Sequence, residues 1–173
     1  NIVVGFNDVR GFSKQPISIS GYLYSNDGGR TFKDGGQLPT PGNQTMFGQK
    51  FPQIFGDPDV KYLGGCNFIY SSLMLKVLGT GIAQTLSIHR STDCGRTWSM
   101  PIEVAPATNP NAAVDVGGNP LDAADKELMD VDPETGFVFS GDLNTTEVRA
   151  TSALDPRIRF MVNAGGANGY SAT

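Results

Sequence analysis

Four charged residues are the best candidates for lining a polar ligand site: Asp57, Asp125, Lys126 and Arg10. Asp57 and Asp125 begin two similar stretches, each of which is expected to start a strand. Carboxylate, ammonium and guanidinium groups at strand ends can bind a polar ligand through charge-assisted hydrogen bonds. The two aspartates can also accept hydrogen bonds from backbone N–H groups where the strands begin. The sequence favours this structural role for both, because residues at repeated positions usually serve the repeated fold.

The titratable residues give little support for a metal site or a nucleophilic triad. His89 is the only histidine, and we expect it in the middle of a strand, packed or facing an edge. The Asp-rich stretch 122–132 offers oxygen ligands for Ca²⁺, but it lacks the spacing of a known calcium loop. A solvated turn explains that stretch better. We therefore predict no metal and no cofactor, with calcium as the lesser alternative.

An eight-residue pattern occurs twice and is the strongest signal in the chain. The copies start at Ser25 and Ser91, 66 residues apart, and both read Ser, any residue, Asp, any, Gly, Arg, Thr, aromatic. This spacing indicates a supersecondary repeat of about that length. The residues assigned a structural role are Ser25, Asp27, Gly29, Thr31 and Phe32 in the first copy, and Ser91, Asp93, Gly95, Thr97 and Trp98 in the second.

The chemistry of the pattern is that of a tight turn between two strands. An aspartate carboxylate can accept hydrogen bonds from backbone N–H groups of the turn. Gly29 and Gly95 stand where such turns need a positive φ. Phe32 and Trp98 are expected to turn inward and cover the hairpin with apolar area. On this interpretation the pattern is structural and none of its residues is catalytic.

This repeated pattern resembles the Asp box, or BNR repeat, of the sialidase superfamily. In that family the box forms the turn between the third and fourth strands of a β-propeller blade, on the side away from the active site. The resemblance implies an all-β propeller of four-stranded antiparallel blades, usually six in number. About two and a half blades of this length fit in the chain, so we expect the remaining blades in other sequence, in another chain or in copies of this one.

The predicted organisation follows the two boxes. A partial blade with the first box occupies residues 1–39, and a complete blade with the second box occupies 57–104. Crossing loops fill 40–56 and 105–124, and a partial, divergent blade fills 125–173, where no third box is recognised. The strands are expected at 2–7, 21–24 and 32–38, then at 57–63, 67–75, 85–90 and 98–104, and finally at 125–132, 137–140 and 157–162. Tyr62 and Tyr70 are expected in the blade core.

Composition limits the kinds of partner. The chain is 39% hydrophobic and 17% charged, with 22 glycines and 11 prolines, as suits short strands joined by many turns. The net charge of −4 is spread along the sequence without a basic stripe, so nucleic acid is an unsuitable partner. No apolar run reaches the ~20 residues that a membrane-spanning helix needs.

The two cysteines have suggestive positions. Cys94 lies in the second box, and Cys66 lies in the expected first turn of the same blade, at the same end. Alternate strands are ~10 Å apart, whereas a disulfide requires a Cα separation below ~7 Å, so the turns would have to lean together. A disulfide and two unpaired thiols are therefore both open. A disulfide would favour a secreted or cell-surface location.

Two functions are compatible with these features. The first is an extracytoplasmic propeller that binds a glycan or a protein surface, or has a structural role in a larger assembly. The alternative is a fragment of an exo-sialidase-like glycoside hydrolase. Sialidases use three arginines, a tyrosine assisted by a glutamate, and an aspartate, and their first arginine lies in an Arg-Ile-Pro type motif that this sequence lacks. No catalytic residue is assigned. The first function is preferred because several crossings that should carry arginines and carboxylates in a hydrolase are instead rich in Asn, Gly and Pro.

Overall fold

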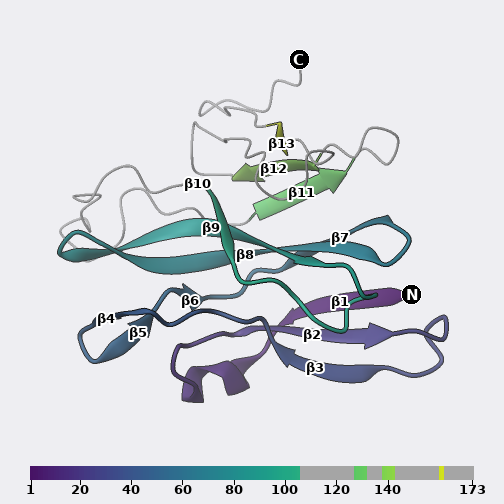
Figure 1. Ribbon diagram of the computed structural model, residues 1–173, viewed down its shortest axis with the longest axis horizontal. Coiled ribbons are helices and arrows are strands. Elements are labelled where there is room, and N and C mark those ends of the chain that lie inside the picture. Colours follow the sequence, from purple (N-terminus) through teal and green to yellow (C-terminus); the bar gives the residue numbers. More distant parts are fainter. Residues whose placement is uncertain (106–126, 132–137, 143–159, 162–173) are drawn as a thin grey trace.

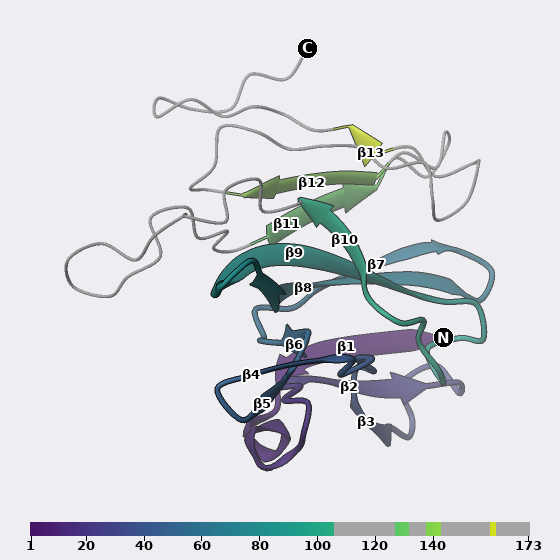
Figure 2. The same ribbon diagram turned by 60° about the vertical axis from the view of Figure 1, so that its left-hand side comes forward.

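The computed structural model describes residues 1–105, 127–131, 138–142 and 160–161. Strands dominate these ranges, and the one helical segment described is a short 3-10 helix, η1 (Val9–Ser13). The strands form three sheets that lie one above another, and a small separate hairpin (Figures 1 and 2). Within the described ranges, no helix is long and apolar enough to cross a membrane.

The first sheet is antiparallel and has the order β1-β2-β3. Its strands are β1 (Ile2–Asn7), β2 (Ser20–Ser25) and β3 (Lys33–Gln37), within one residue of the predicted positions. The first of the repeated turns joins β2 to β3. Asp8 begins η1 by accepting a hydrogen bond from the backbone N of Arg10 at 3.0 Å. The segment between the strands predicted at 2–7 and 21–24 therefore contains a helical turn.

The second sheet is also antiparallel, with the order β10-β9-β8 and β7 on the far edge of β8. Its long strands are β7 (Asp59–Gly64), β8 (Asn67–Leu78), β9 (Gly81–Ser91) and β10 (Ile102–Ala105), and the two-residue strand β6 (Gln53–Ile54) also pairs with β8. The β8–β9 hairpin is longer than predicted, and β10 begins four residues later than predicted. The delay has a physical reason, because Trp98 leaves the strand path and enters the core.

The third sheet contains β11 (Glu127–Val131), β12 (Val138–Asp142) and β13 (Phe160–Met161). The β11–β12 pair is antiparallel, but β13 pairs with β12 in parallel, which contradicts the antiparallel blade predicted here. Parallel neighbours need a crossover of a dozen or more residues, and residues 143–159 provide that length. Asp125, Lys126 and the Asp-rich stretch upstream of β11 lie outside the described residues.

The first two sheets repeat one another in hydrogen-bond register. A shift of 66 residues converts all the β1–β2 pairs into β8–β9 pairs, and two of the β2–β3 pairs, Gly21–Gln37 and Tyr22–Gly36, into β9–β10 pairs. Examples are Ile2–Ser25 with Phe68–Ser91, Val4–Leu23 with Tyr70–His89, and Gly36–Tyr22 with Ile102–Ile88. The repeat found in the turns therefore extends through three strands of each sheet.

Aromatic residues fill the space between these two sheets. Trp98 packs edge-to-face on Tyr22 of the first sheet and on Tyr70 of the second, with ring centroids 5.7 Å and 5.5 Å away. Tyr70 is fully buried, as predicted. Tyr62, in contrast, is 55% exposed, so its assignment to the core was wrong. It lies near the turn end of the edge strand β7, where its ring contacts the Phe68 ring at a centroid distance of 5.2 Å.

The crossing predicted at 40–56 is more structured than a loop. It contains the hairpin of β4 (Gln44–Met46) and β5 (Gln49–Phe51), followed by β6 (Gln53–Ile54). Ile54 connects the second sheet to the segment that enters β2, because β6 pairs with β8 while Ile54 N donates to Ile17 O at 3.0 Å, three residues before β2 begins. The first two sheets are thus connected by backbone hydrogen bonds as well as by side-chain packing.

Candidate functional site

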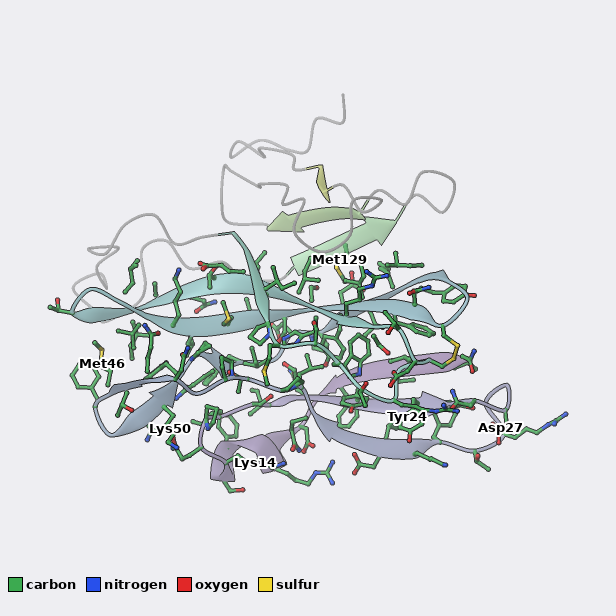
Figure 3. All side chains as sticks on the ribbon, in the orientation of Figure 1. Lys14, Tyr24, Asp27, Met46, Lys50 and Met129 are labelled. Carbon is green, nitrogen blue, oxygen red and sulfur yellow. A yellow bond between two sulfur atoms is a disulfide. The ribbon has the colours of Figure 1, made fainter. Side chains whose placement is uncertain are left out.

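The turns of the first two sheets gather at two opposite ends (Figures 1 and 3). At one end lie the repeated turns, among them the labelled Asp27, together with the β7–β8 turn. At the other end lie the β4–β5 hairpin, with the labelled Met46 and Lys50, and the β8–β9 turn. We call them the box end and the loop end. In the family that the boxes resemble, the active site lies on the side away from the boxes, so the loop end is where a ligand site is expected.

Each box turn is held by one aspartate and one serine. Asp27 Oδ1 accepts from the backbone N of Thr31 at 2.9 Å, and its Oδ2 accepts from the Thr31 hydroxyl at 2.6 Å. Ser25 Oγ accepts from the backbone N of Gly29 at 2.9 Å and donates to Asp27 at 2.8 Å. The second box repeats these four bonds with the same distances, through Asp93 and Ser91. The carboxylates are therefore part of the turn structure.

The same bonds keep both aspartates ionised. Hydrogen bonds from Thr31, followed by one from Ser25, hold the pKa of Asp27 well below its ordinary value. Partial burial raises the pKa of Asp93, but hydrogen bonds from Thr97 and Ser91 outweigh burial and the net direction is downward. A carboxylate that is stabilised in its charged form and saturated with donors is a poor general acid.

The two boxes also contact each other. Arg96 Nε of the second box donates to Asn26 Oδ1 of the first at 3.0 Å, and Asn26 Nδ2 donates to Cys94 O at 3.4 Å. Tyr22 of the first sheet donates its hydroxyl proton to Arg96 O at 3.2 Å. The arginine of one box is thus a link to the preceding box.

The boxes differ in the burial of their aromatic residues. Trp98 is 8% exposed, whereas Phe32 is 45% exposed, so the prediction that Phe32 turns inward was wrong. Trp98 is covered because the first sheet lies against the second. No described residue covers the corresponding face of the first sheet at Phe32 to the same extent.

A disulfide joins Cys66 and Cys94, which are 28 residues apart in sequence. Their Cα atoms are 4.1 Å apart, and Cys94 N donates to Cys66 O at 3.0 Å. The β7–β8 turn therefore leans against the second box, as a disulfide between alternate strands requires. This contact is at the box end, far from the candidate ligand site.

Arg10 forms salt bridges with two carboxylates, those of Asp8 and Asp34. Its guanidinium bonds both oxygens of Asp8 at 2.7–3.0 Å and Asp34 Oδ2 at 2.9 Å. Hydrogen bonds from Arg10 lower the pKa of Asp8 to about 2, although burial of this carboxyl acts in the opposite direction. Gln37 also donates to Asp8. Arg10 thus links η1 to β3. Its positive charge is already paired with carboxylates of the protein, so it is a poor binding group for an anionic ligand.

Asp57 does not begin a strand as predicted. It lies at a kink with φ of 50°, and β7 starts two residues later, after Pro58. Its backbone N donates to Asn7 Oδ1 at 2.9 Å. The acceptor for the backbone at this point is therefore a side chain of β1, and not the Asp57 carboxylate as the sequence favoured. Arg10 and Asp57 therefore both lie near the end of β1, where Arg10 contacts Asp8 and Asp57 contacts Asn7. The other two candidates, Asp125 and Lys126, lie outside the described residues.

Sequence reasoning missed Asp59, the first residue of β7. Asp59 Oδ2 accepts from the backbone N of Met129 at 2.7 Å and Oδ1 pairs with Lys61 Nζ at 3.1 Å. Asp59 therefore attaches the third sheet to the second. Pro58 was the available signal, because proline lacks a backbone donor and often precedes the first paired residue of a strand.

His89 is fully buried and has no access to a ligand. Its Nδ1 lies 2.9 Å from Ser99 O, and burial lowers its pKa to about 4. The residue is packed, as the sequence indicated. Among the described residues, no group of three or more His, Cys, Asp or Glu side chains could hold a metal ion.

The loop end offers amides and exposed phenylalanine rings. Phe47, at the β4–β5 turn, is 80% exposed, and Phe12 is 51% exposed and packs edge-to-face on Phe55. Gln15 Nε2 donates to Gln49 Oε1 at 2.5 Å, and Gln15 Oε1 accepts from Lys50 N at 3.1 Å. An open aromatic ring beside fixed amide groups can contact a sugar ring or a peptide. None of these described loop-end side chains is a nucleophile next to a base.

Comparisons of the chain with family models, with curated proteins and with solved structures find no match.

Proposed function

We propose that this chain is part of a sialidase-like β-propeller with Asp boxes, and that it acts outside the cytoplasm as a module that binds a glycan. The observation behind this proposal is the 66-residue repeat. It relates both the box turns and the strand register of two stacked sheets. Sheets related in this way, each contacting its neighbours, are the building plan of repeat architectures such as propellers.

The contacts of the charged residues favour binding over catalysis in this segment. Arg10 is paired with Asp8 and Asp34, and the box aspartates are saturated by their own turns. His89 is buried. A carboxylate-binding arginine needs free donors, and a general acid needs a pKa near the working pH. These side chains meet neither requirement, so the glycoside hydrolase alternative would need catalytic groups elsewhere.

The disulfide supports the extracytoplasmic part of the proposal. Structural disulfides form and persist in oxidising compartments and are rare in the cytosol. The Cys66–Cys94 bond uses both cysteines of the chain. A secreted or cell-surface protein would keep this bond.

A glycan array tests the binding role directly. The folded chain is applied to sialylated, galactosylated and neutral glycans, with Phe47→Ala as the loop-end variant. Phe32→Ala is the matched control, because Phe32 is also an exposed phenylalanine but lies in a box turn. We expect binding of one glycan class that Phe47→Ala weakens at least tenfold and that Phe32→Ala leaves unchanged.

Two other results would lead to different conclusions. No glycan binding, or equal effects of the two substitutions, would overturn the glycan-binding role at the loop end. Release of sialic acid from a fluorogenic sialoside by the purified chain would replace that role with the hydrolase alternative.

A further inference from the structure

The first sheet has an exposed apolar face at positions that are buried in the second sheet. Ile2, Val4 and Phe32 are 39%, 42% and 45% exposed. A shift of 66 residues turns them into Phe68, Tyr70 and Trp98, which are 4%, 0% and 8% exposed. The latter three are buried because they face the first sheet across the shared core. The same positions are thus interface residues in one repeat and surface residues in the other.

The side of the first sheet on which Ile2 and Val4 lie follows from their neighbours. A Cβ on Gly5 would approach Val60, Pro58 and Tyr70 within 3.0 Å, so Gly5 faces the second sheet. Adjacent residues of a strand point to opposite faces, which places Val4 on the far side. A Cβ on Gly29 would meet Ile2 at 3.1 Å and Phe32 at 4.0 Å, so these two side chains lie near the same turn.

The equivalent arginines of the two boxes, Arg30 and Arg96, differ in the same way as the apolar residues. Its counterpart Arg96 donates to Asn26 of the neighbouring box at 3.0 Å. Arg30 itself is exposed, and no hydrogen bond or ion pair joins its side chain to a described residue. The first box therefore has a donor at the position from which the second box reaches its neighbour.

The edge of β1 shows the same relationship. In the second sheet, β7 pairs along the outer edge of β8, with Asp59 opposite Ser71 and Tyr62 opposite Phe68. The corresponding edge of β1 pairs with no described strand. An unpaired edge next to an exposed apolar face is a site where another sheet can be added.

We propose that the face formed by Ile2, Val4, Phe32 and Arg30 is a docking surface for one further sheet of the same 66-residue repeat. That sheet lies on the first as the first lies on the second, and its box supplies a polar side chain to Arg30. The partner is inferred from the interface between the first two sheets, because the proposed interface would continue the same stacking. That existing interface shows which side chains such a partner presents. This inference depends on the repeat and not on glycan binding.

An added repeat tests the proposal on the full chain. A second copy of residues 1–66 is placed directly ahead of Asn1, with Cys66→Ser in the added copy so that it brings no free thiol. Asn1 corresponds to Asn67, so the added β7 leads into β1 through the turn that joins β7 to β8. The added first sheet can then cover the docking surface and the added β7 can pair with β1.

Thiol reactivity reports whether the surface becomes covered. Val4→Cys, in the original copy, is the probe, since both native cysteines are in the disulfide. Ile82→Cys is the matched control, because Ile82 is 41% exposed and lies on β9, away from the docking surface. We expect Val4→Cys to react readily in the 173-residue chain and at least tenfold more slowly in the extended chain, while Ile82→Cys reacts equally in both.

Two results would overturn the proposal. One is an unchanged rate for Val4→Cys when the repeat is added. The other is an added repeat that protease digestion removes while the original chain survives, because a surface shaped for this sheet should keep it folded. Arg30→Ala in the original copy should reduce the protection of Val4→Cys, whereas an apolar contact alone would leave that protection unchanged. Glycan binding can fail in the array without affecting any of these readouts.

Discussion

The hydroxyl oxygens of Ser20 and Ser72 lie 2.5 Å apart between the first two sheets. Gly56 N donates to Ser20 Oγ at 3.0 Å, and Ser72 Oγ lies 2.8 Å from Gly56 O. Both serines are fully buried. This serine pair connects one sheet to the other through two buried hydroxyl groups, and it binds the backbone just before the kink at Asp57.

Removing the Ser20 hydroxyl should destabilise the fold. Ser20→Ala leaves the buried Gly56 N–H without its acceptor, which costs about 1–3 kcal/mol in the free energy of unfolding. Urea denaturation followed by circular dichroism measures this quantity. Ser13→Ala is the control, since Ser13 is exposed on η1 and its loss should cost less than about 0.5 kcal/mol.

A double-mutant cycle separates the pair from the individual serines. Ser20 and Ser72 share a hydrogen bond and both bind Gly56, so the effects of Ser20→Ala and Ser72→Ala should differ from additivity by about 0.5–3 kcal/mol. Additive effects would mean that the two hydroxyls do not act as a unit.

The aromatic residues of the two boxes should differ in their importance for stability. Trp98 packs between Tyr22 and Tyr70, so Trp98→Ala should cost about 3–5 kcal/mol or prevent folding. Phe32→Ala, at the equivalent position, should cost less than about 1 kcal/mol because the ring is 45% exposed. Urea midpoints by far-UV circular dichroism give both values, and Trp98→Phe provides a milder variant if the alanine variant does not fold. Equal costs for the two alanine variants would contradict the burial difference.

The sequence was sufficient to predict the repeated turns and, in the first sheet, the strands that the turn joins. Two Ser-x-Asp-x-Gly-Arg-Thr-aromatic copies predicted hairpins of similar construction, and the strands of the first sheet lie where expected. Local patterns succeed here because the donors and acceptors of each box lie within seven residues. The all-β class of the described ranges follows from the same turns and strands.

Other features depend on residues far apart in sequence. The exposure of Phe32 depends on whether a sheet covers it, and nothing in its own box differs from that of Trp98 in this respect. Asp57 was misplaced because Asn7, 50 residues away, satisfies its backbone. The ion pairs of Arg10 depend on how η1 lies against β3. No sequence motif near Phe32, Asp57 or Arg10 predicts these long-range contacts.

His89 should make stability depend on pH in mildly acidic solution. Burial lowers its pKa from 6.5 to about 4 in the folded state, so between these values only the unfolded state binds the proton. The free energy of unfolding should therefore fall as the pH falls from 6.5 to 4, by about 1.4 kcal/mol per pH unit from this residue. Below pH 4 its contribution to the slope should end. Urea denaturation at half-unit pH steps, compared with His89→Gln, isolates this component, and parallel curves for the two proteins would rule it out.

The Cys66–Cys94 disulfide should stabilise the chain by about 3–4 kcal/mol, because it closes a loop of 28 residues that would otherwise gain entropy on unfolding. The test variant combines Cys66→Ser with Cys94→Gly. Glycine is chosen because Cys94 has φ of 65° and its counterpart in the first box is Gly28, with φ of 75°. This replacement avoids adding backbone strain to the loss of the bond.

Urea denaturation with and without dithiothreitol distinguishes the bond from the side chains. The native chain should lose stability on reduction, and the double variant should have the same midpoint in both conditions. The second box should remain formed in the variant, since Asp93 and Ser91 hold its turn without help from either cysteine. A native chain whose midpoint is insensitive to reduction would show that the two turns stay together through the Cys94 N–Cys66 O hydrogen bond and the surrounding core alone.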